Sequence, residues 1–146
     1  MITEPIDLSA ALSRIDQLWS PRIVTRVNDY DVRIVKVAGE YIWHSHADTD
    51  EFFLVLDGEL NIALRDAPTA DADAASSDHA GLTERVVTLR PGSVFVVPRG
   101  VEHKPFSTTG ASVLLFEPTG TMNVGDHHDS IPDYITATAG QPLDQA

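Results

Sequence analysis

The fold of this chain is indicated by the stretch Gly39-Glu-Tyr-Ile-Trp-His44-Ser-His46-Ala-Asp-Thr-Asp-Glu51-Phe-Phe-Leu-Val-Leu-Asp-Gly58. His44 and His46 are two residues apart, and on a β-strand residues i and i+2 point to the same face. After a polar turn, Glu51 begins an apolar run that is typical of a second strand. Because a turn between neighbouring strands can bring Glu51 beside both histidines, the pattern indicates a site for a divalent transition metal.

The same residues also allow an interpretation without a metal. A His-x-His pair is a short motif with a high false-positive rate, and Glu51 could lie in water at the end of its strand. Against this, a carboxylate at the head of a run as apolar as residues 52–56 is expected to be partly enclosed. An enclosed charge without a partner costs several kcal/mol, and a metal ion would supply that partner.

The composition limits the class of protein. With 146 residues, the chain suits one domain over residues 1–146. It has no cysteine, which excludes disulfides, thiolate nucleophiles and thiolate-bound metals. It has no apolar run of about 18 residues that would span a membrane, and its N-terminus lacks the features of a signal peptide. We therefore expect a cytoplasmic protein.

The formal net charge of −12 argues against partners that are themselves negatively charged. Such a surface repels nucleic acid and anionic lipid at long range, although solubility alone accounts for the charge equally well. We expect neither a nucleic-acid partner nor a membrane partner.

Apolar spacing predicts one helix and about eight strands. The helix is expected over residues 7–19, with Asp7 as its N-cap and Pro21 beyond its end. The following apolar runs are separated by Gly, Pro and Asp turns, which is typical of an antiparallel sandwich or barrel. We expect strands at residues 22–27, 30–37, 41–46, 51–56, 60–65, 85–89, 94–97 and 112–117.

Two segments lie outside this strand pattern. Residues 66–82 are rich in small and acidic residues without a period, which predicts a mobile loop between two strands. His79 falls inside this loop and has no neighbour at a ligand spacing, so we interpret it as a surface histidine. Residues 118–146 form a C-terminal tail beyond the barrel core, which spans residues 22–117.

A second informative segment is Gly92-Ser-Val-Phe-Val-Val-Pro98-Arg-Gly100-Val-Glu-His103-Lys-Pro-Phe-Ser107. Pro-x-Gly is turn chemistry, because Pro fixes φ and Gly tolerates a positive φ. The turn follows an apolar strand and delivers His103 onto the next strand. Taken alone, His103 would be interpreted as a core histidine with hydrogen-bond partners, but together with the first segment it becomes a third imidazole for the same site.

These two segments resemble the two sequence motifs of the cupin family. The first cupin motif is a glycine, His-x-His, a glutamate and a further glycine, and it is matched by Gly39, His44, His46, Glu51 and Gly58. The second motif is a glycine, Pro-x-Gly and a histidine, and it is matched by Gly92, Pro98, Gly100 and His103.

Two positions depart from the family pattern. Only four residues separate Gly39 from His44, where the family commonly has five. Ser107 stands where the family has an asparagine. Neither position is a metal ligand in the family, so the departures weaken the resemblance little.

The resemblance implies an all-β, jelly-roll barrel of antiparallel strands with one divalent transition metal ion inside it. The implied ligands are His44, His46, Glu51 and His103. Whether the ion is Fe, Mn, Zn, Ni or Co does not follow, and a barrel that keeps these residues only as a hydrogen-bonded network is the alternative.

The resemblance also limits the possible functions without choosing one. It implies a metal-dependent enzyme that acts on a small molecule, of the isomerase or epimerase, dioxygenase or lyase type. The alternative is a non-catalytic protein that binds or senses a small ligand. No catalytic residue outside the ligand set can be nominated from the sequence.

The two ends of the chain carry further expectations. His127 and His128 are adjacent, so on an extended chain they point to opposite sides and suit one metal poorly. The Asn-x-Gly-Asp stretch before them looks like the ending of small cupins, where it folds over the barrel. Small cupins commonly dimerise, and we expect a homodimer formed by the N-terminal helix, with Leu12, Ile15 and Trp19, and by the face of residues 23–27.

Overall fold

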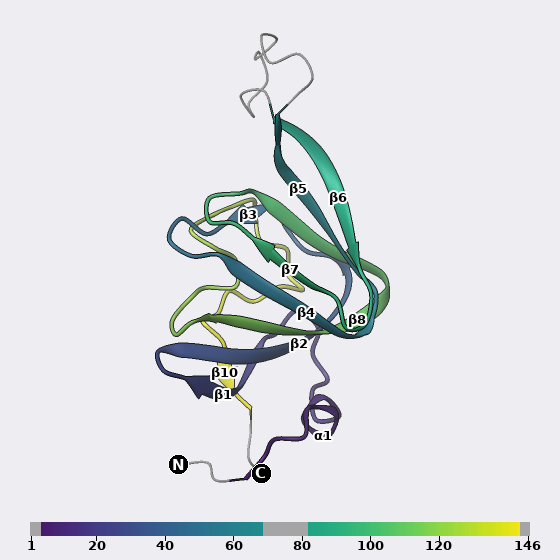
Figure 1. Ribbon diagram of the computed structural model, residues 1–146, viewed down its shortest axis with the longest axis vertical. Coiled ribbons are helices and arrows are strands. Elements are labelled where there is room, and N and C mark those ends of the chain that lie inside the picture. Colours follow the sequence, from purple (N-terminus) through teal and green to yellow (C-terminus); the bar gives the residue numbers. More distant parts are fainter. Residues whose placement is uncertain (1–3, 69–81, 144–146) are drawn as a thin grey trace.

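The computed structural model describes residues 4–68 and 82–143. Figure 1 shows a curled, strand-rich barrel with one short helix outside it and a long hairpin, β5 and β6, that extends beyond the other strands. The elements are α1 (Leu8–Leu12), β1 (Arg22–Val27), β2 (Tyr30–Glu40), β3 (His44–Ser45), β4 (Glu51–Gly58), β5 (Leu60–Pro68), β6 (Leu82–Leu89), β7 (Val94–Val97), β8 (His103–Pro118), β9 (His127–His128) and β10 (Gln141–Pro142).

Strand β8 connects the two halves of the barrel. Its second half lies between β2 and β4, with Phe116 opposite Val32 on one side and Phe52 on the other. Its first half pairs with β5 and meets β3 where His103 lies opposite His44. These pairings are antiparallel, and among the described strands only β1 and β10 run parallel. The structure therefore confirms the antiparallel jelly-roll fold.

The core of the barrel follows from the alternation along its strands. In β4, Phe53 and Val55 are buried while Phe52 and Leu54 are only partly buried. Since alternate residues of a strand point to opposite faces, the buried set lines the interior, where removal of apolar surface from water stabilises the fold. The interior cluster also takes in residues of β2, β5, β7 and β8.

The N-terminal helix is shorter than the sequence predicts. Asp7 caps it as expected, since its Oδ1 accepts a hydrogen bond from the Ala10 amide at 3.1 Å. The helix ends at Leu12 instead of continuing to residue 19. Beyond it, the chain is held by the sheet: Trp19 has a φ of 58° and its amide donates to the Lys36 carbonyl at 2.8 Å. Tertiary hydrogen bonds thus override the helical spacing.

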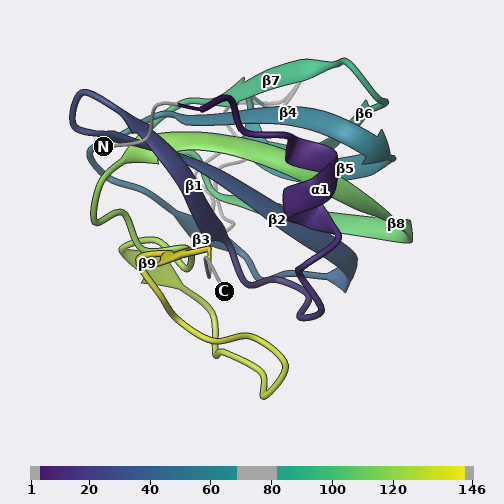
Figure 2. The same ribbon diagram turned by 90° about the horizontal axis from the view of Figure 1, so that it is seen from below.

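The apolar residues of the predicted helix pack within a single chain. Ile15 and Trp19 are buried, the former with Val24 and Ile34 in a cluster on the outer face of β1 and β2. Figure 2 shows α1 lying against this outer side of the barrel. The expectation that Ile15 and Trp19 are available for a dimer contact is therefore wrong.

The strands lie where the sequence pattern predicts them, but most of them differ from the prediction in length. Strands β1 and β7 have the expected bounds, whereas β2, β4, β5, β6 and β8 are longer and β3 is reduced to two residues. Of the expected loop at residues 66–82, the structure describes only the ends, which belong to β5 and β6. His79 and the predicted mobility lie outside the described residues. Within the described residues, no helix is long and apolar enough to cross a membrane.

Candidate metal centre

The structure brings the four residues of the predicted metal site together. His44 lies on β3 and His46 directly after it, while Glu51 begins β4 and His103 begins β8. All four side chains are buried, with exposed fractions between 1% and 6%. One possible ligand atom from each residue lies within 4.8 Å of those of the others. A group of this kind could hold a metal ion.

The turn before His103 is tied directly to the strand that carries the other two histidines. Gly100 has a φ of 81°, which a glycine adopts without the steric cost of a side chain. Its amide donates to the His46 carbonyl at 2.7 Å. The Pro98-x-Gly100 turn therefore fixes His103 and His46 relative to each other.

Backbone carbonyls orient two of the imidazole rings. His44 Nδ1 lies 2.9 Å from the Ile42 oxygen, and His103 Nδ1 lies 3.0 Å from the Val101 oxygen. A carbonyl can only accept, so both Nδ1 atoms carry the hydrogen and donate it. In the neutral ring, each Nε2 then presents a lone pair to the centre of the cluster, which is the arrangement that a metal-binding histidine needs.

The donor atoms at the centre of the cluster are arranged around a position that suits a cation. His103 Nε2 lies 2.9 Å from Glu51 Oε1. His46 Nε2 lies 3.1 Å from the same oxygen without hydrogen-bond geometry, and it is a buried atom with no hydrogen-bond partner. Lone pairs of neutral imidazoles and a carboxylate oxygen repel each other at these distances unless a proton or a metal ion lies between them. The residues present therefore fit a metal ion.

The burial of the cluster sets the protonation of its members. Burial, and then the nearby His103, lower the pKa of His44 to about 3. Burial alone would raise the pKa of Glu51, but His103 and His46 outweigh it and hold that pKa well below its usual range. For His46, burial lowers the pKa, yet Glu51 outweighs burial and the net shift is upward. A neutral His44 and an ionised Glu51 are the forms that bind metal.

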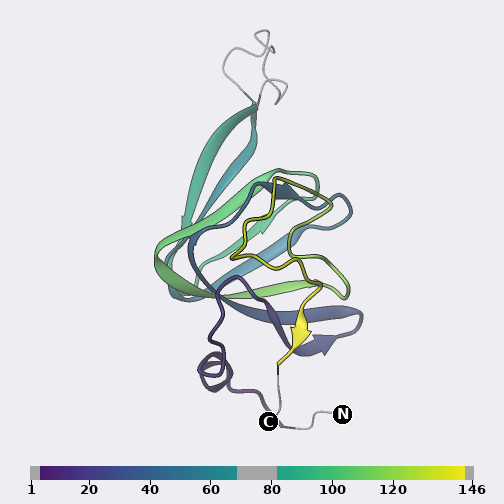
Figure 3. The ribbon, with the colours of Figure 1, turned by 180° about the vertical axis from the view of Figure 1, so that it is seen from behind.

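The C-terminal tail supports the outer edge of β3. Asp126 Oδ2 accepts from the Ala47 amide at 2.7 Å, and the Asp126 amide donates to the Ser45 carbonyl at 2.9 Å. Strand β9 then pairs with β3, and the tail crosses behind the barrel (Figure 3). His127 and His128 are exposed and outside the cluster, although the backbone of His128 lies opposite that of His44.

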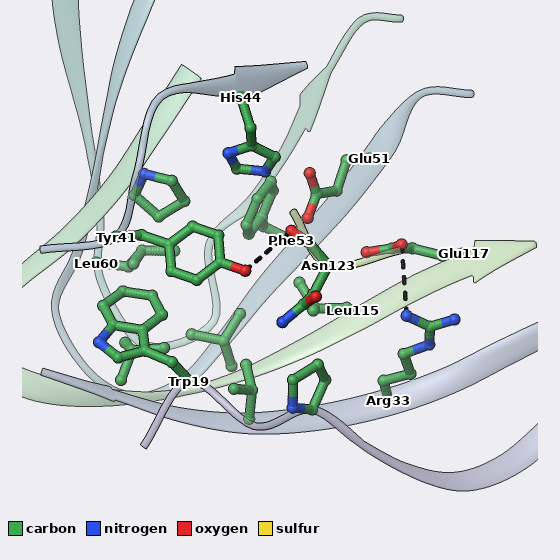
Figure 4. A pocket seen from close by; sticks show the side chains of 15 residues that line it. Trp19, Arg33, Tyr41, His44, Glu51, Phe53, Leu60, Leu115, Glu117 and Asn123 are labelled. Carbon is green, nitrogen blue, oxygen red and sulfur yellow. Dashed lines mark hydrogen bonds and ion pairs between the residues drawn. The ribbon is translucent and has the colours of Figure 1, made fainter. Parts of the chain in front are cut away.

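A cavity inside the barrel adjoins the cluster. His44 and Glu51 line one side of it, as Figure 4 shows. Most of the remaining wall is apolar and is formed by Trp19, Val35, Val37, Tyr41, Phe53, Leu60, Val113 and Leu115. A small molecule in this cavity would thus meet the cluster on one side and apolar groups on the others.

The cavity also has a charged corner that the sequence analysis did not identify. Arg33 and Glu117 line it, and Asp31 lies behind them with no exposed surface. Arg33 Nη2 lies 2.9 Å from Asp31 Oδ2, and Arg33 Nη1 lies 3.8 Å from Glu117 Oε2. Burial and the charge of Glu51 raise the pKa of Glu117 well above its usual range.

A signal for this corner was present in the strand alternation. In β8, Glu117 has the same parity as the buried Val113 and Leu115, and in β2, Arg33 has the same parity as Val35. Alternate residues share a face, so the pattern places both charged side chains in the barrel interior.

Comparison with known proteins agrees with this fold. No family model matches the chain. The uncharacterized protein YdbB of Bacillus subtilis (strain 168) is 40% identical over 102 residues, which is 70% of this chain and 88% of that protein. The crystal structure of protein NMB1881 from Neisseria meningitidis is 30% identical, with a TM-score of 0.61 over 79% of this chain and 99% of that one.

Hydroquinone 1,2-dioxygenase from Sphingomonas sp. TTNP3, solved in complex with 4-nitrophenol, is 25% identical with a TM-score of 0.64. The likeness covers 79% of this chain and only 32% of the dioxygenase chain. A cupin-2 domain containing protein from Shewanella frigidimarina NCIMB 400 is 39% identical, with a TM-score of 0.64 over 77% of this chain and 93% of that one. This likeness extends over nearly the whole of a solved cupin, and the strand order and the buried cluster agree with it. The chain therefore belongs to the cupin family.

Proposed function

We propose that this protein is a metal-dependent cupin enzyme that acts on a small molecule in the barrel cavity. One divalent transition metal ion is bound by His44, His46, Glu51 and His103. The observation that carries the proposal is the buried His46 Nε2 without a hydrogen-bond partner, 3.1 Å from a carboxylate oxygen that also faces His103. Buried polar atoms are seldom left unpaired, and a metal ion would pair all four donors at once.

The residues around the ion would control access to it. Three nitrogens and one oxygen leave coordination positions open, so the ion supplies Lewis-acid chemistry, or oxygen activation if it is iron. Because His44 and Glu51 also line the cavity, a molecule held there would lie beside an ion that these residues hold. The apolar walls around Phe53 and Leu115 bind its body and limit the entry of water.

Among the possible reactions, the comparison favours a dioxygenase. The solved hydroquinone 1,2-dioxygenase shares the barrel over 79% of this chain at 25% identity. We infer that iron is the functional ion and that the substrate is a ring compound of similar chemistry. Isomerase, epimerase and lyase activities remain the other candidates for a cupin metal site, and none of the named relatives supports them.

The test is elemental analysis of untagged protein purified without a chelator, followed by oxygen-uptake measurements with hydroquinone. We expect one transition metal ion per chain, and oxygen uptake by the iron-loaded protein but not by the zinc-loaded protein. Absence of bound metal would reject the metal centre. Stoichiometric iron without oxygen uptake or any turnover would reject the dioxygenase and leave a protein that only binds its ligand.

We also infer that the protein acts as a homodimer. Val94 and Val96 on the edge strand β7 are 58% and 46% exposed, and they continue across a face whose outward side chains on β4 and β8 are apolar. A second copy of this face would cover both the apolar surface and the unpaired edge of β7.

A further inference from the structure

A tryptophan just before β3 is stacked with an arginine of the long β5–β6 hairpin (Figure 1). Trp43 precedes His44 in the chain, and the guanidinium carbon of Arg65 lies over its ring, 3.7 Å from the ring centroid. We propose that Trp43 and Arg65 are positioning residues of the metal centre, because their stack holds β3 in place and so orients His44. The proposal rests on the proposed function, since it takes His44 as a ligand of the metal.

The alternation along β5 and β8 places this stack on the outer face of the barrel. Leu64 and His103 are 0% and 1% exposed and belong to the inner face. Arg65 and Lys104 follow them directly in the chain, so their side chains point to the other face. The Lys104 Nζ also lies over the Trp43 ring, 5.8 Å from its centroid. Trp43 therefore packs on the outside of the wall whose inner side carries the metal cluster.

Strand β3 has little backbone pairing of its own. It is two residues long, and it meets β8 at one residue pair, His44 opposite His103. On the side of the tail, the Asp129 amide donates to the Trp43 carbonyl at 3.1 Å. A short segment with few ladder hydrogen bonds has low local stability. Side-chain contacts such as the stack on Trp43 therefore decide how firmly the backbone of β3 is held.

Arg65 is itself anchored by carboxylates on neighbouring segments. Its Nε lies 3.3 Å from Glu84 Oε1 on β6, and its Nη1 lies 3.5 Å from Glu102 Oε2 just before β8. Its backbone amide also donates to the Glu102 carbonyl at 3.1 Å. The Arg65 side chain is only 17% exposed, and a cation–π contact strengthens as its partners lose water. Trp43 is therefore packed against a cation that the barrel wall already holds in place.

The position of Trp43 affects the His44 ring through the backbone that they share. His44 Nδ1 lies 2.9 Å from the Ile42 oxygen, and Trp43 is the residue between these two. A shift of the backbone at Trp43 changes the direction of this hydrogen bond, and with it the direction in which His44 Nε2 points. Mutation of groups that orient metal ligands lowers metal affinity by about 10–100-fold. The stack thus raises metal affinity by fixing His44 before the metal binds.

The experiment measures zinc affinity by competition with a chelator, and the visible absorption spectrum of cobalt-loaded protein, which depends on ligand geometry. We expect Trp43→Leu to lower the zinc affinity by about tenfold and to shift the cobalt spectrum. Trp43→Phe keeps an aromatic face for Arg65, so it should lie closer to the wild type in both readouts. Arg65→Met removes the charge but keeps a long side chain, and it should act in the same direction as Trp43→Leu.

Arg85→Met is the matched control on the same hairpin. Arg85 Nε lies 2.8 Å from Asp66 Oδ1, so this variant loses an arginine and its ion pair but keeps the stack of Trp43 and Arg65. Its zinc affinity and cobalt spectrum should equal those of the wild type. A double-mutant cycle tests the stack itself: if both residues act through one contact, Trp43→Leu combined with Arg65→Met should lose less zinc affinity than the two single losses together predict.

Several results would overturn the positioning role. One is a Trp43→Leu protein with the zinc affinity and cobalt spectrum of the wild type, even if its melting temperature falls, because a purely structural contact changes stability alone. Equal losses in Arg65→Met and Arg85→Met, or fully additive losses in the double variant, would also overturn it.

Two outcomes need a separate reading. If Trp43→Leu does not fold, Arg65→Lys decides the question: it keeps a cation over the ring, so it should bind zinc more tightly than Arg65→Met, and equal affinities would reject the role. Wild-type protein that binds no zinc would reject the proposed function and this role with it, whereas a zinc-binding wild type with unaffected stack variants would reject the positioning role alone.

Discussion

At the scale of single residues, the histidines of the cluster differ in how firmly they are held. His44 and His103 are each fixed by a hydrogen bond from Nδ1 to a carbonyl two residues earlier in the chain. His46 makes no such bond within the described part of the chain, and its Nε2 is the unpaired atom of the group. We infer that metal binding orders His46 most, while His44 and His103 are oriented before the metal arrives.

The replacement His103→Ala tests the four-residue shell. We expect metal affinity to fall by more than about tenfold. Mutation of residues that only hydrogen-bond to a metal ligand already lowers metal affinity by that factor. The barrel should stay folded, because its apolar strands do not depend on the metal. Metal content and circular dichroism check both statements, with exposed His128→Ala as the control. Full occupancy of His103→Ala at stoichiometric metal would reject the shell, and equal loss from His128→Ala would place the tail in the site.

The pH dependence of metal binding follows from the imidazoles. A protonated imidazole cannot bind metal, so protons compete with the ion as the pH falls. The pKa of His44 lies at about 3 and does not limit binding, whereas the pKa of His46 is raised above its ordinary value, because Glu51 outweighs the opposing effect of burial. Protons therefore compete with the ion at a higher pH than they would at an ordinary imidazole, and we expect occupancy to fall as the pH drops below neutrality. Elemental analysis after dialysis at a series of pH values tests this, and occupancy that stays constant down to pH 4 or rises in acid would contradict it.

At the scale of elements, the two-residue strand β3 depends on the tail for one of its edges. It meets β8 at a single residue pair, His44 opposite His103. On its other side it is paired by β9 and by the contacts of Asp126. The tail is therefore part of the framework of the metal cluster, although its own histidines stay outside the cluster.

Two glycines of the tail provide a matched pair of variants. Gly120 and Gly125 both have positive φ, 93° and 73°, so Gly→Ala strains the backbone at each by about 1–2 kcal/mol. At Gly120 the added methyl group meets nothing within 4 Å, whereas at Gly125 it collides with the Ser45 carbonyl and lies 3.3 Å from the His44 ring. We expect Gly125→Ala to lower the melting temperature by several degrees more than Gly120→Ala and to weaken metal binding.

Thermal unfolding followed by circular dichroism, together with metal titration, measures both effects. Gly120→Ala should keep the metal affinity of the wild type, because the change does not reach β3. Equal effects of the two variants on both readouts would show that the tail does not hold the metal-bearing strand in place.

At the scale of the whole molecule, one outer face remains apolar in the single chain. Helix α1 covers the part of that face over β1 and β2. The remainder runs from the edge strand β7 across β4 to β8, and its outward residues are Val94, Val96, Phe52, Leu54, Leu114 and Phe116. Apolar rows of this kind on an edge strand favour association of the sheet with a partner.

The homodimer predicts a site-specific effect of charge. We expect the wild type to sediment as a dimer in the micromolar range, and Val96→Glu to sediment as a monomer, because the buried carboxylate would have no partner in the interface. Val86→Glu is the matched control, since Val86 is 55% exposed on the β5–β6 hairpin, away from this face. A wild-type monomer throughout the micromolar range, or equal effects of the two variants, would reject this interface.

The features that depend on periodicity and turns could be predicted from the amino-acid sequence. Alternation located the strands, and the His-x-His spacing with Glu51 indicated three donors for one site. The expected pairing of their two strands is wrong, because β3 and β4 each pair with β8 and not with each other. The turn at Pro98-x-Gly100 and the cupin resemblance added His103. The structure places all four within 4.8 Å of one another, while their role as ligands of a metal remains a prediction. These features could be predicted because the alternation of a strand and the backbone φ angles of a turn depend only on residues that are close in the chain.

The length of the helix, the position of the tail and the contacts of Arg33 and Glu117 depend on tertiary packing. The helical spacing over residues 7–19 gives way after Leu12 because the sheet offers Trp19 hydrogen bonds that a helix cannot. Alternation places Glu117 in the interior, but its position beside Glu51 depends on which strands become neighbours. That choice is made by pairings between residues far apart in the chain, which local patterns do not settle by themselves.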